Sequence, residues 1–139
     1  MSELIRFGIS LPKKLSNDFD SYIAQEGYTN RSEAIRDIIR NELIKKEWHQ
    51  SCNIIAGAIL FIYDHHFRSL LNKITSIQHD FHDLIISTQH IHLDHNNCLE
   101  IAAVKGKAAA VQSLYKKIKS LKGVRHASLS MSSTGKNLH

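Results

Sequence analysis

A strand pattern without a nearby partner constrains the fold of this chain more than any other feature of the sequence. Apolar and polar side chains alternate from residue 5 to residue 11, as in a strand with one buried and one solvent-facing side. The apolar positions are Ile5, Phe7, Ile9 and Leu11, and the others are Arg6, Gly8 and Ser10. An unpaired edge strand exposes its backbone N–H and C=O groups, so this strand must find a partner.

Two short helices are predicted directly after the strand. Pro12 suits the first turn of a helix that Gly27 ends, and apolar side chains recur between them at helical spacing. Asn30 and Glu33 form the N-cap and N3 pair of a second helix with its own apolar stripe. The second half of the chain could supply a partner for residues 5–11. The simpler solution is the same strand of a second subunit, paired antiparallel about a two-fold axis.

A two-stranded ribbon of this kind fits the major groove of B-DNA. Its outward positions would point at base edges, and these are Arg6, Gly8 and Ser10. The start of the second helix would offer backbone N–H groups, a hydroxyl and a guanidinium to phosphate, from Asn30, Arg31 and Ser32. The pattern alone is equally compatible with solvated charges on a strand and a helix.

The second half of the chain predicts the order βαββαβ, that of a ferredoxin-like sandwich. Strands are expected at residues 54–63, 84–94, 98–105 and 124–131, with helices around residues 67–77 and over 107–122. Asp64 is expected to cap the first of these helices, and Asn96 with Asn97 marks a tight turn. The near-continuous apolarity of the first strand indicates that both of its faces are covered. We therefore expect an α+β chain with domains at residues 1–47 and 53–132 and a disordered tail at 133–139.

Seven of the ten histidines fall between His65 and His95, and a cysteine follows three residues later. Imidazole and thiolate are ligands for zinc, nickel, copper and cobalt. The pattern H-x10-H-x-H-x5-C is formed by His79, His90, His92 and Cys98. Histidines two apart on a strand project from one face, and Cys98 begins the next strand, so three ligands can converge within one subunit. Glu100 shares the face of Cys98 and could orient a ligand imidazole.

The remaining histidines near this pattern are expected to take extra metal weakly and not to be primary ligands; they are His65, His66, His82 and His95. The spacing does not choose the metal. Three nitrogens and a thiolate would satisfy tetrahedral zinc, and the general affinity order favours copper. Square-planar geometry would select Ni(II) or Cu(II).

Charge and cysteine content give weaker indications. A formal net charge of +5 suits an anionic partner, although an excess of this size is also common for solubility alone. Glu3 and Arg6 interrupt the first residues, and no apolar run approaches the roughly 20 residues that span a bilayer. We therefore expect a cytoplasmic protein with no membrane association, in which Cys52 and Cys98 remain thiols.

The residues between 5 and 40 carry a resemblance to a known class. IRFGISL followed by GYTNRSEAIRDIIR is similar to a ribbon-helix-helix repressor. Together with H-x10-H-x-H-x5-C-L-E, the chain resembles the family of nickel-responsive regulators from about residue 4 to residue 132. One departure lies at Gly8, where the family usually carries a polar side chain. Glycine cannot donate from a side chain, so base readout at that position is weakened.

The resemblance implies a fold, a metal and an assembly. It implies a dimeric ribbon-helix-helix head and an ACT-type domain that builds a homotetramer, a dimer of dimers. It further implies one Ni(II) per subunit, held by His90, His92 and Cys98 of one chain and by His79 of a neighbouring chain. The expected function is a nickel-dependent repressor of nickel uptake or nickel-enzyme genes that binds a palindromic operator.

Two other classes of function fit the sequence less well. A zinc deaminase would need H-x-E and P-C-x-x-C, and neither motif occurs in the sequence. A catalytic metal also keeps an open coordination position, whereas four strong protein ligands favour a closed, regulatory site. A small-molecule sensor or antitoxin with the same head would not need the histidine and cysteine pattern. We therefore do not expect an enzyme.

Overall fold

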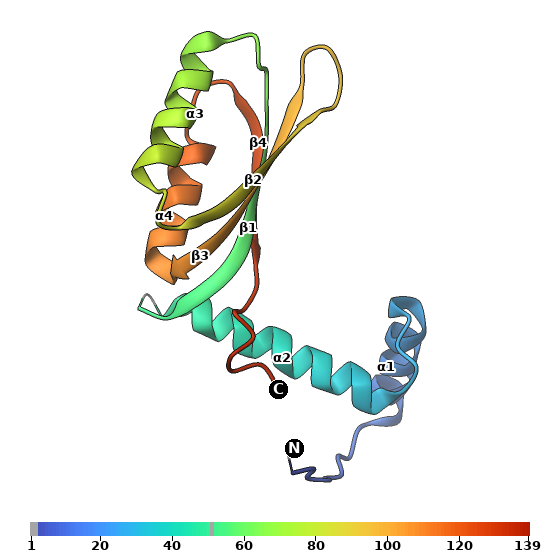
Figure 1. Cartoon of the computed structure of the whole chain (residues 1–139). Coiled ribbons are helices and arrows are strands. Elements are labelled where there is room, and N and C mark those ends of the chain that lie inside the picture. Colours follow the sequence, from blue (N-terminus) through green and yellow to red (C-terminus); the bar gives the residue numbers. More distant parts are fainter. Residues whose placement is uncertain (1–2, 51) are drawn as a thin grey trace. The chain divides into compact units, whose positions relative to one another are not determined.

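The structure of the protein is a computed structural model that describes residues 3–50 and 52–139. The chain divides into two compact units, the first ending at Ile39 and the second beginning at Arg40. Helices and strands follow one another as α1 (Lys13–Glu26), α2 (Arg31–His49), β1 (Ile54–Tyr63), α3 (Arg68–Asp80), β2 (Ile85–His92), β3 (Cys98–Lys107), α4 (Ala108–Lys119) and β4 (Val124–Met131) (Figure 1). Among the residues described, no helix has the length and apolarity that crossing a membrane requires.

The first unit holds α1 and the beginning of α2. Gly27 follows α1 with φ of 79°, a left-handed conformation that ends the helix. The side chain of Asn30 accepts the backbone N–H of Glu33 at 2.8 Å, which is the cap that the sequence predicts for α2. The hydroxyl of Tyr28 donates to the carboxylate of Asp37 and so ties the loop between the helices to α2.

The strand predicted at residues 5–11 does not form in the single chain, where residues 3–12 have no regular secondary structure. A strand requires a hydrogen-bonded ladder, and no described residue pairs with this segment. Its apolar side chains remain in solvent, since Ile5, Phe7 and Ile9 are 83%, 74% and 67% exposed. The sequence analysis expects the pairing strand on a second subunit, and that pairing stays a prediction.

The second unit is an antiparallel sheet with two helices on one face. The strand order is β2-β3-β1-β4, and every neighbouring pair is antiparallel. Figure 1 shows α3 and α4 together on one side of this sheet. The order and topology confirm the predicted ferredoxin-like, ACT-type α+β domain.

The core of the second unit lies between the sheet and these helices. Alternate residues of β1 and β3 point into it, including Ile59, Phe61 and Val104, and α4 adds Leu114 and others. Burying one such side chain contributes roughly 1.5–3 kcal/mol. The other face of β1 is only partly buried in the single chain. Cover on both faces, which the sequence predicts, is therefore not found within one chain.

The predicted cap of α3 is wrong. Phe67 stands at the N-cap and forms no side-chain cap bond, and α3 begins at Arg68. The carboxylate of Asp64 instead accepts the backbone N–H of His66 at 2.9 Å. This short-range bond closes a turn directly after β1, so the side chain is used before the helix begins.

One glycine of β1 has no room for a side chain, because the backbone of β4 lies close to it. A Cβ atom added to Gly57 would lie 2.6 Å from the carbonyl oxygen of Ser130 in β4 and 3.2 Å from the ring of buried Trp48. A Cβ added to Gly106 would meet only a methyl group of Leu84, at 2.3 Å. Backbone cannot move aside as readily as the end of a leucine side chain, so the two positions differ in tolerance.

Residues 132–139 contain no helix or strand. The Nε of Arg40 donates to the carbonyl of His139 at 2.5 Å. The predicted disorder of this tail and the exact domain limits stay predictions.

Candidate metal centre and nucleic-acid interface

The register of β2 and β3 gathers predicted ligands at one end of the sheet. His92 lies opposite Cys98, and His90 lies opposite Glu100. Residues directly opposite in an antiparallel pair project from the same face. The hairpin between the strands is closed by Asp94, whose carboxylate accepts two backbone N–H groups of the turn, each at 2.8 Å.

The buried thiol of Cys98 touches two imidazoles. Its Sγ lies 3.3 Å from Nδ1 of His92 and 3.3 Å from Nδ1 of His65. The ligand atoms of these three residues all lie within 4.8 Å of one another. One sulfur and two nitrogens converging in this way match the donor preference of nickel, copper, zinc and cobalt. The donor set therefore fits a borderline transition metal.

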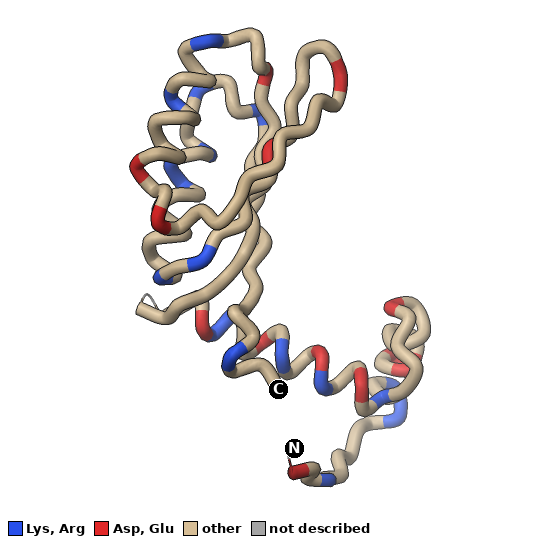
Figure 2. The backbone as a smooth tube through the Cα atoms, in the orientation of Figure 1, with Lys and Arg blue, Asp and Glu red and all other residues tan. Residues whose placement is uncertain are grey.

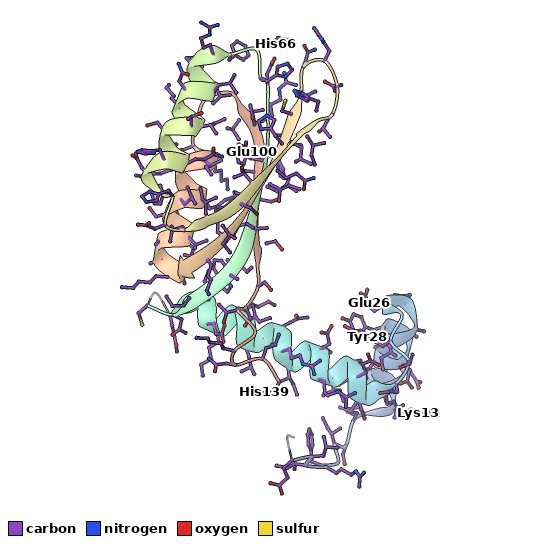
Figure 3. All side chains as sticks on the ribbon, viewed as in Figure 1. Lys13, Glu26, Tyr28, His66, Glu100 and His139 are labelled. Atoms are coloured by element: carbon purple, nitrogen blue, oxygen red, sulfur yellow. The ribbon has the colours of Figure 1, made fainter. Side chains whose placement is uncertain are left out.

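The second imidazole of the strand motif, His90, is held by two other side chains. The hydroxyl of Tyr63 lies 2.8 Å from Nε2, and Oε1 of Glu100 lies 2.9 Å from Nδ1. Glu100, which Figure 3 labels on the sheet, is 5% exposed. Its other oxygen accepts from Gln78 of α3 at 2.6 Å. Both ring nitrogens of His90 therefore have partners in this position.

Burial sets the protonation of these groups. It raises the pKa of the Cys98 thiol, and nearby carboxylates raise it further, so the neutral thiol is favoured. It also raises the pKa of the Tyr63 hydroxyl, with smaller contributions from Glu100 and Cys98. A protonated phenol can donate to Nε2 of His90, which leaves Nδ1–H to donate to Glu100. Burial, followed by neighbouring imidazoles, lowers the pKa of His65 and keeps that ring neutral.

His79 stands apart from the other three predicted ligands. It lies in the last turn of α3, and its ring centroid is 6.1 Å from that of His82. Among the described residues, it does not belong to the group whose ligand atoms cluster around Cys98. Its assignment to a neighbouring subunit therefore stays a prediction.

A further group of possible ligands adjoins the thiol. Asp64, His65 and His66 each bring one ligand atom within 4.8 Å of the others. The ring of His95 lies 5.0 Å from that of His66, which Figure 3 labels at the end of the domain beside the β2–β3 hairpin. The weak secondary binding that the sequence predicts for these histidines and for His82, which lies beside His79, stays a prediction.

The sequence did not predict the position of His65, which contacts both Cys98 and His92. The available signal was its separation along the sequence from Tyr63, the residue of β1 that pairs with Cys98. His65 lies in the turn two residues after Tyr63, so this neighbourhood places it near the thiol although strand alternation no longer applies there. That reasoning requires knowing that β1 and β3 are neighbours.

The residues predicted to contact DNA lie in the first unit. Arg6, Ser10 and Ser32 are exposed, and Asn30 is engaged in capping α2. The guanidinium of Arg31 donates to both carboxylate oxygens of Asp20, at 2.8 and 2.7 Å. This bond holds the pKa of Asp20 below its usual value. A phosphate group that bound Arg31 would have to replace or share this partner.

Comparison with known proteins identifies both parts of the chain. Residues 56–132 match the family described as NikR C terminal nickel binding domain, and residues 2–46 match the ribbon-helix-helix proteins of the copG family. The chain is 61% identical over 135 residues to a protein of Syntrophus aciditrophicus named as a nickel-responsive regulator, covering 97% of this chain and 98% of that protein. A protein of Chlorobaculum tepidum with the same name is 56% identical over 133 residues, covering 96% and 98%.

A solved structure shares the fold of part of this chain at low identity. An uncharacterized protein of Thermotoga maritima aligns with a TM-score of 0.52 and 12% identity, covering 57% of this chain and 98% of that one. At this identity the likeness concerns the fold alone.

Proposed function

This chain belongs to the family of nickel-responsive regulators, and we propose that it represses its target genes by binding a palindromic operator more tightly once nickel is bound. It is a nickel-dependent transcriptional regulator with a DNA-binding head and a nickel-binding domain. Target genes for nickel uptake or nickel enzymes would close a feedback loop. Coupling between two binding sites is reciprocal, so operator DNA should in turn raise the affinity for nickel.

The nickel ligands that we propose are His90, His92 and Cys98 of one subunit and His79 of another. The observation that carries this assignment is the pairing of His92 with Cys98, whose buried Sγ lies 3.3 Å from an imidazole nitrogen. Bound there, Ni(II) would supply its electronic preference for four donors in one plane. Hard cations such as Mg²⁺ prefer oxygen ligands and would compete poorly.

His90 must change partners to join these ligands. Its Nε2 is bonded to Tyr63 and its Nδ1 to Glu100. If Nδ1–H continues to donate to Glu100, Nε2 is the nitrogen that becomes available when the hydroxyl of Tyr63 moves away. Glu100 then acts as a positioning residue that fixes the ring and raises the basicity of the ligand nitrogen. Before that exchange, His65 occupies the place beside the thiol.

The assembly that we propose is a homotetramer with one nickel per subunit. His79 sits at the end of α3, outside the cluster around Cys98, which leaves it free to serve a neighbouring chain. The exposed apolar residues between 5 and 11 would pair with those of a second subunit and form a ribbon. Two such ribbons could contact both half-sites of a palindrome.

Within each ribbon, Arg6 and Ser10 would read base edges in the major groove. Asn30, Arg31 and Ser32 would place the start of α2 against the phosphate backbone. The cap formed by Asn30 orders this first turn, so its free N–H groups are already directed outwards. Arg31 would exchange Asp20 for phosphate on binding.

DNA binding with and without nickel tests this proposal. Operator fragments recovered by selection from random duplexes would be titrated with the full chain alone and with one equivalent of Ni(II) per subunit. We expect nickel to raise the affinity for selected fragments, and zinc at equal occupancy to raise it less, because the filled d shell of zinc imposes no planar geometry. Equal affinity with and without nickel would refute the nickel-dependent repressor.

Co-expression of two variants tests the shared site. His79→Ala removes one ligand and Cys98→Ala removes another, so each variant alone should lose tight nickel binding. In mixed oligomers, a site can take its histidine from one variant and its other three ligands from the second. Recovery of part of the nickel binding is expected, and no recovery would place all four ligands within one chain.

A further inference from the structure

The positive charge of this protein is concentrated at its C-terminal end. Residues 101–139 contain eight Lys and Arg residues and no Asp or Glu. Residues 1–100 contain ten Lys and Arg residues and thirteen Asp and Glu residues. The segment that matches the ribbon-helix-helix family, residues 2–46, contains eight Lys and Arg residues and seven Asp and Glu residues, so it is nearly neutral. Non-specific attraction to DNA comes mainly from cations that neutralise phosphates. A nearly neutral head supplies little of that attraction, so the cations of the second unit call for an explanation.

Most of these cations surround α4. They are exposed and lie in two groups, before the first turn of the helix and at its C-terminal end: Lys105, Lys107, Lys116, Lys117, Lys119 and Lys122. In Figure 2, blue positions, which mark Lys and Arg, lie toward both ends of this helix. Within the described part of the chain, no carboxylate lies within ion-pair distance of any of the six. Their charges are therefore not neutralised inside the protein.

Helix stability explains only half of this arrangement. Lys116, Lys117 and Lys119 lie in the last turn, where a cation interacts favourably with the helix dipole. Lys107 is the N-cap of α4, and Lys105 lies two residues before it, at the end where the dipole disfavours cations. The first turn of α4 also contains no acidic residue. The fold gains nothing from cations at that end, which suggests that a ligand uses them.

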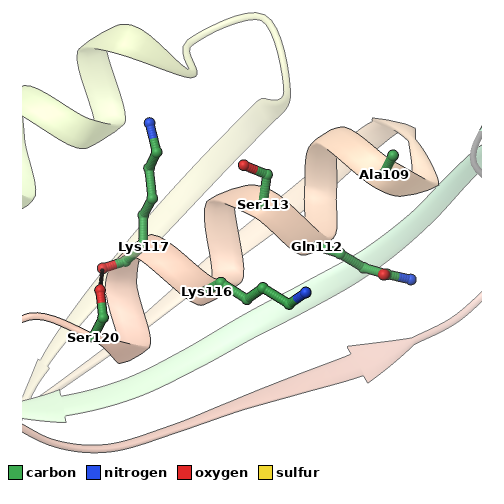
Figure 4. A pocket seen from close by; sticks show the side chains of 6 residues that line it. All are labelled: Ala109, Gln112, Ser113, Lys116, Lys117 and Ser120. Carbon is green, nitrogen blue, oxygen red and sulfur yellow. Dashed lines mark hydrogen bonds between the residues drawn. The ribbon is translucent and has the colours of Figure 1, made fainter.

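The exposed side of α4 presents donors to such a ligand. Ser113, Lys116 and Lys117 line a shallow depression along the helix between Ala109 and Ser120 (Figure 4). Gln112 also lines it, and one N–H of its amide is already used by the carbonyl of Trp48, at 3.1 Å. Ammonium, amide and hydroxyl groups of this kind are the side-chain donors that contact phosphate oxygens.

Aromatic rings order two of the lysines. The Nζ of Lys117 lies 4.9 Å from the ring centroid of Phe81, and the Nζ of Lys119 lies 5.7 Å from that of Tyr115. A cation held over a ring keeps its N–H groups available to an anion, and less side-chain freedom is lost on binding.

We propose that this face of α4 binds the phosphate backbone of duplex DNA, in addition to the head. The inference rests on the function of the chain as a DNA-binding regulator. An acidic protein is the less favoured partner, because the face has no exposed aromatic or large aliphatic anchor, and lysine is depleted in protein–protein interfaces. Duplex DNA needs only a row of unpaired cations.

The salt dependence of binding to non-specific DNA tests the proposal. The nickel-loaded full chain would be titrated against a random-sequence duplex of about 40 base pairs, by fluorescence anisotropy, between about 50 and 200 mM salt. The test variant is Lys116→Gln with Lys117→Gln. The control, Lys45→Gln with Lys46→Gln, removes the same charge from α2, where Lys45 pairs with Glu42.

The test variant should lower the slope of log affinity against log salt by about one for each lysine that contacts phosphate. Its affinity near 0.1 M salt should fall roughly tenfold or more, while the control keeps the slope of the original chain. Because all these side chains are exposed, unchanged circular dichroism and nickel stoichiometry are expected. Should the test variant fold poorly, Lys105→Gln with Lys107→Gln offers the same measurement at the other end of α4.

Equal slopes in the test variant, the control and the original chain would overturn the proposal. An unchanged slope for DNA combined with lost binding to poly-glutamate would overturn it in favour of an acidic protein partner. If the original chain bound no duplex at all, the regulator function itself would fail, and that result is distinguishable from failure of the α4 surface alone.

Discussion

Tyr63 and Glu100 hold opposite sides of one imidazole, so removing them should change nickel affinity in opposite directions. The hydroxyl of Tyr63 occupies Nε2 of His90 at 2.8 Å, and Glu100 accepts from Nδ1 at 2.9 Å. Nickel binding through Nε2 has to displace the hydroxyl but can keep the carboxylate. Tyr63→Phe should therefore tighten nickel binding, and Glu100→Gln should weaken it.

The geometry bounds both effects. A neutral hydrogen bond contributes about 0.5–1.5 kcal/mol net, so losing the Tyr63 bond should tighten nickel binding by about two- to thirteenfold. Glu100→Gln keeps the shape of the buried side chain and removes the charge that supports the Nδ1–H donor. Loss of such an outer partner weakens metal binding by roughly 10- to 100-fold.

Competition with a chelator of known nickel affinity measures both changes. Tyr28→Phe is the matched control, because its hydroxyl bonds to Asp37 in the first unit and contacts no imidazole. It should leave nickel affinity unchanged. If Tyr63→Phe weakened nickel binding as Glu100→Gln does, the hydroxyl would support the bound state, and the proposed exchange of partners at His90 would be wrong.

Three further outcomes follow from the structure. Arg6→Ala should abolish sequence-specific binding in a gel-shift titration and leave nickel stoichiometry unchanged, since one base contact is worth about 1–3 kcal/mol; retained specificity would contradict the ribbon. Gly57→Ala should cost about 1–3 kcal/mol in urea unfolding because its Cβ meets backbone, and Gly106→Ala should cost less, so equal costs would refute that distinction. The bond to Arg31 lowers the pKa of the Asp20 carboxyl from 3.8. The pair therefore stabilises the head fully at pH values above 3.8, and this stabilisation is lost as the pH falls through the lower pKa of the folded state. Asp20→Asn should flatten the acid-side loss of thermal stability, and an unchanged acid transition would assign that loss to other groups.

The elements that depend on local chemistry were predictable from the sequence. Gly27 ends α1 and Asn30 caps α2 because each acts within its own turn. β1 runs from Ile54 to Tyr63 as its apolar run predicts. The strand predicted at residues 5–11 is absent from the single chain, because a strand needs a pairing partner and the alternating pattern does not itself supply one. The role of Asp64 could not be decided locally, because one carboxylate can serve either a turn or a helix start.

The part of the candidate site that depends on the alternation of side chains along a strand was predictable from the sequence. Parity puts His90 and His92 on one face, and the observed register adds Cys98 and Glu100 to it. Parity does not fix side-chain rotamers, so it could not show that His90 bonds to Tyr63 of β1 and not to the thiol. That contact depends on which strands are neighbours in the sheet.

Burial of the Cys98 thiol disfavours its thiolate form and also makes the site more selective among metal ions. Cys98 is fully buried, and the pKa of its thiol is raised, so a cation has to displace a proton in order to bind. A metal that binds sulfur weakly gains too little to offset this displacement, whereas a borderline or soft metal forms a strong bond to the thiolate. The same burial favours neutral His65, which is already a potential ligand without losing a proton. The desolvation that disfavours the free thiolate therefore also discriminates against the hard divalent cations that are abundant in cells.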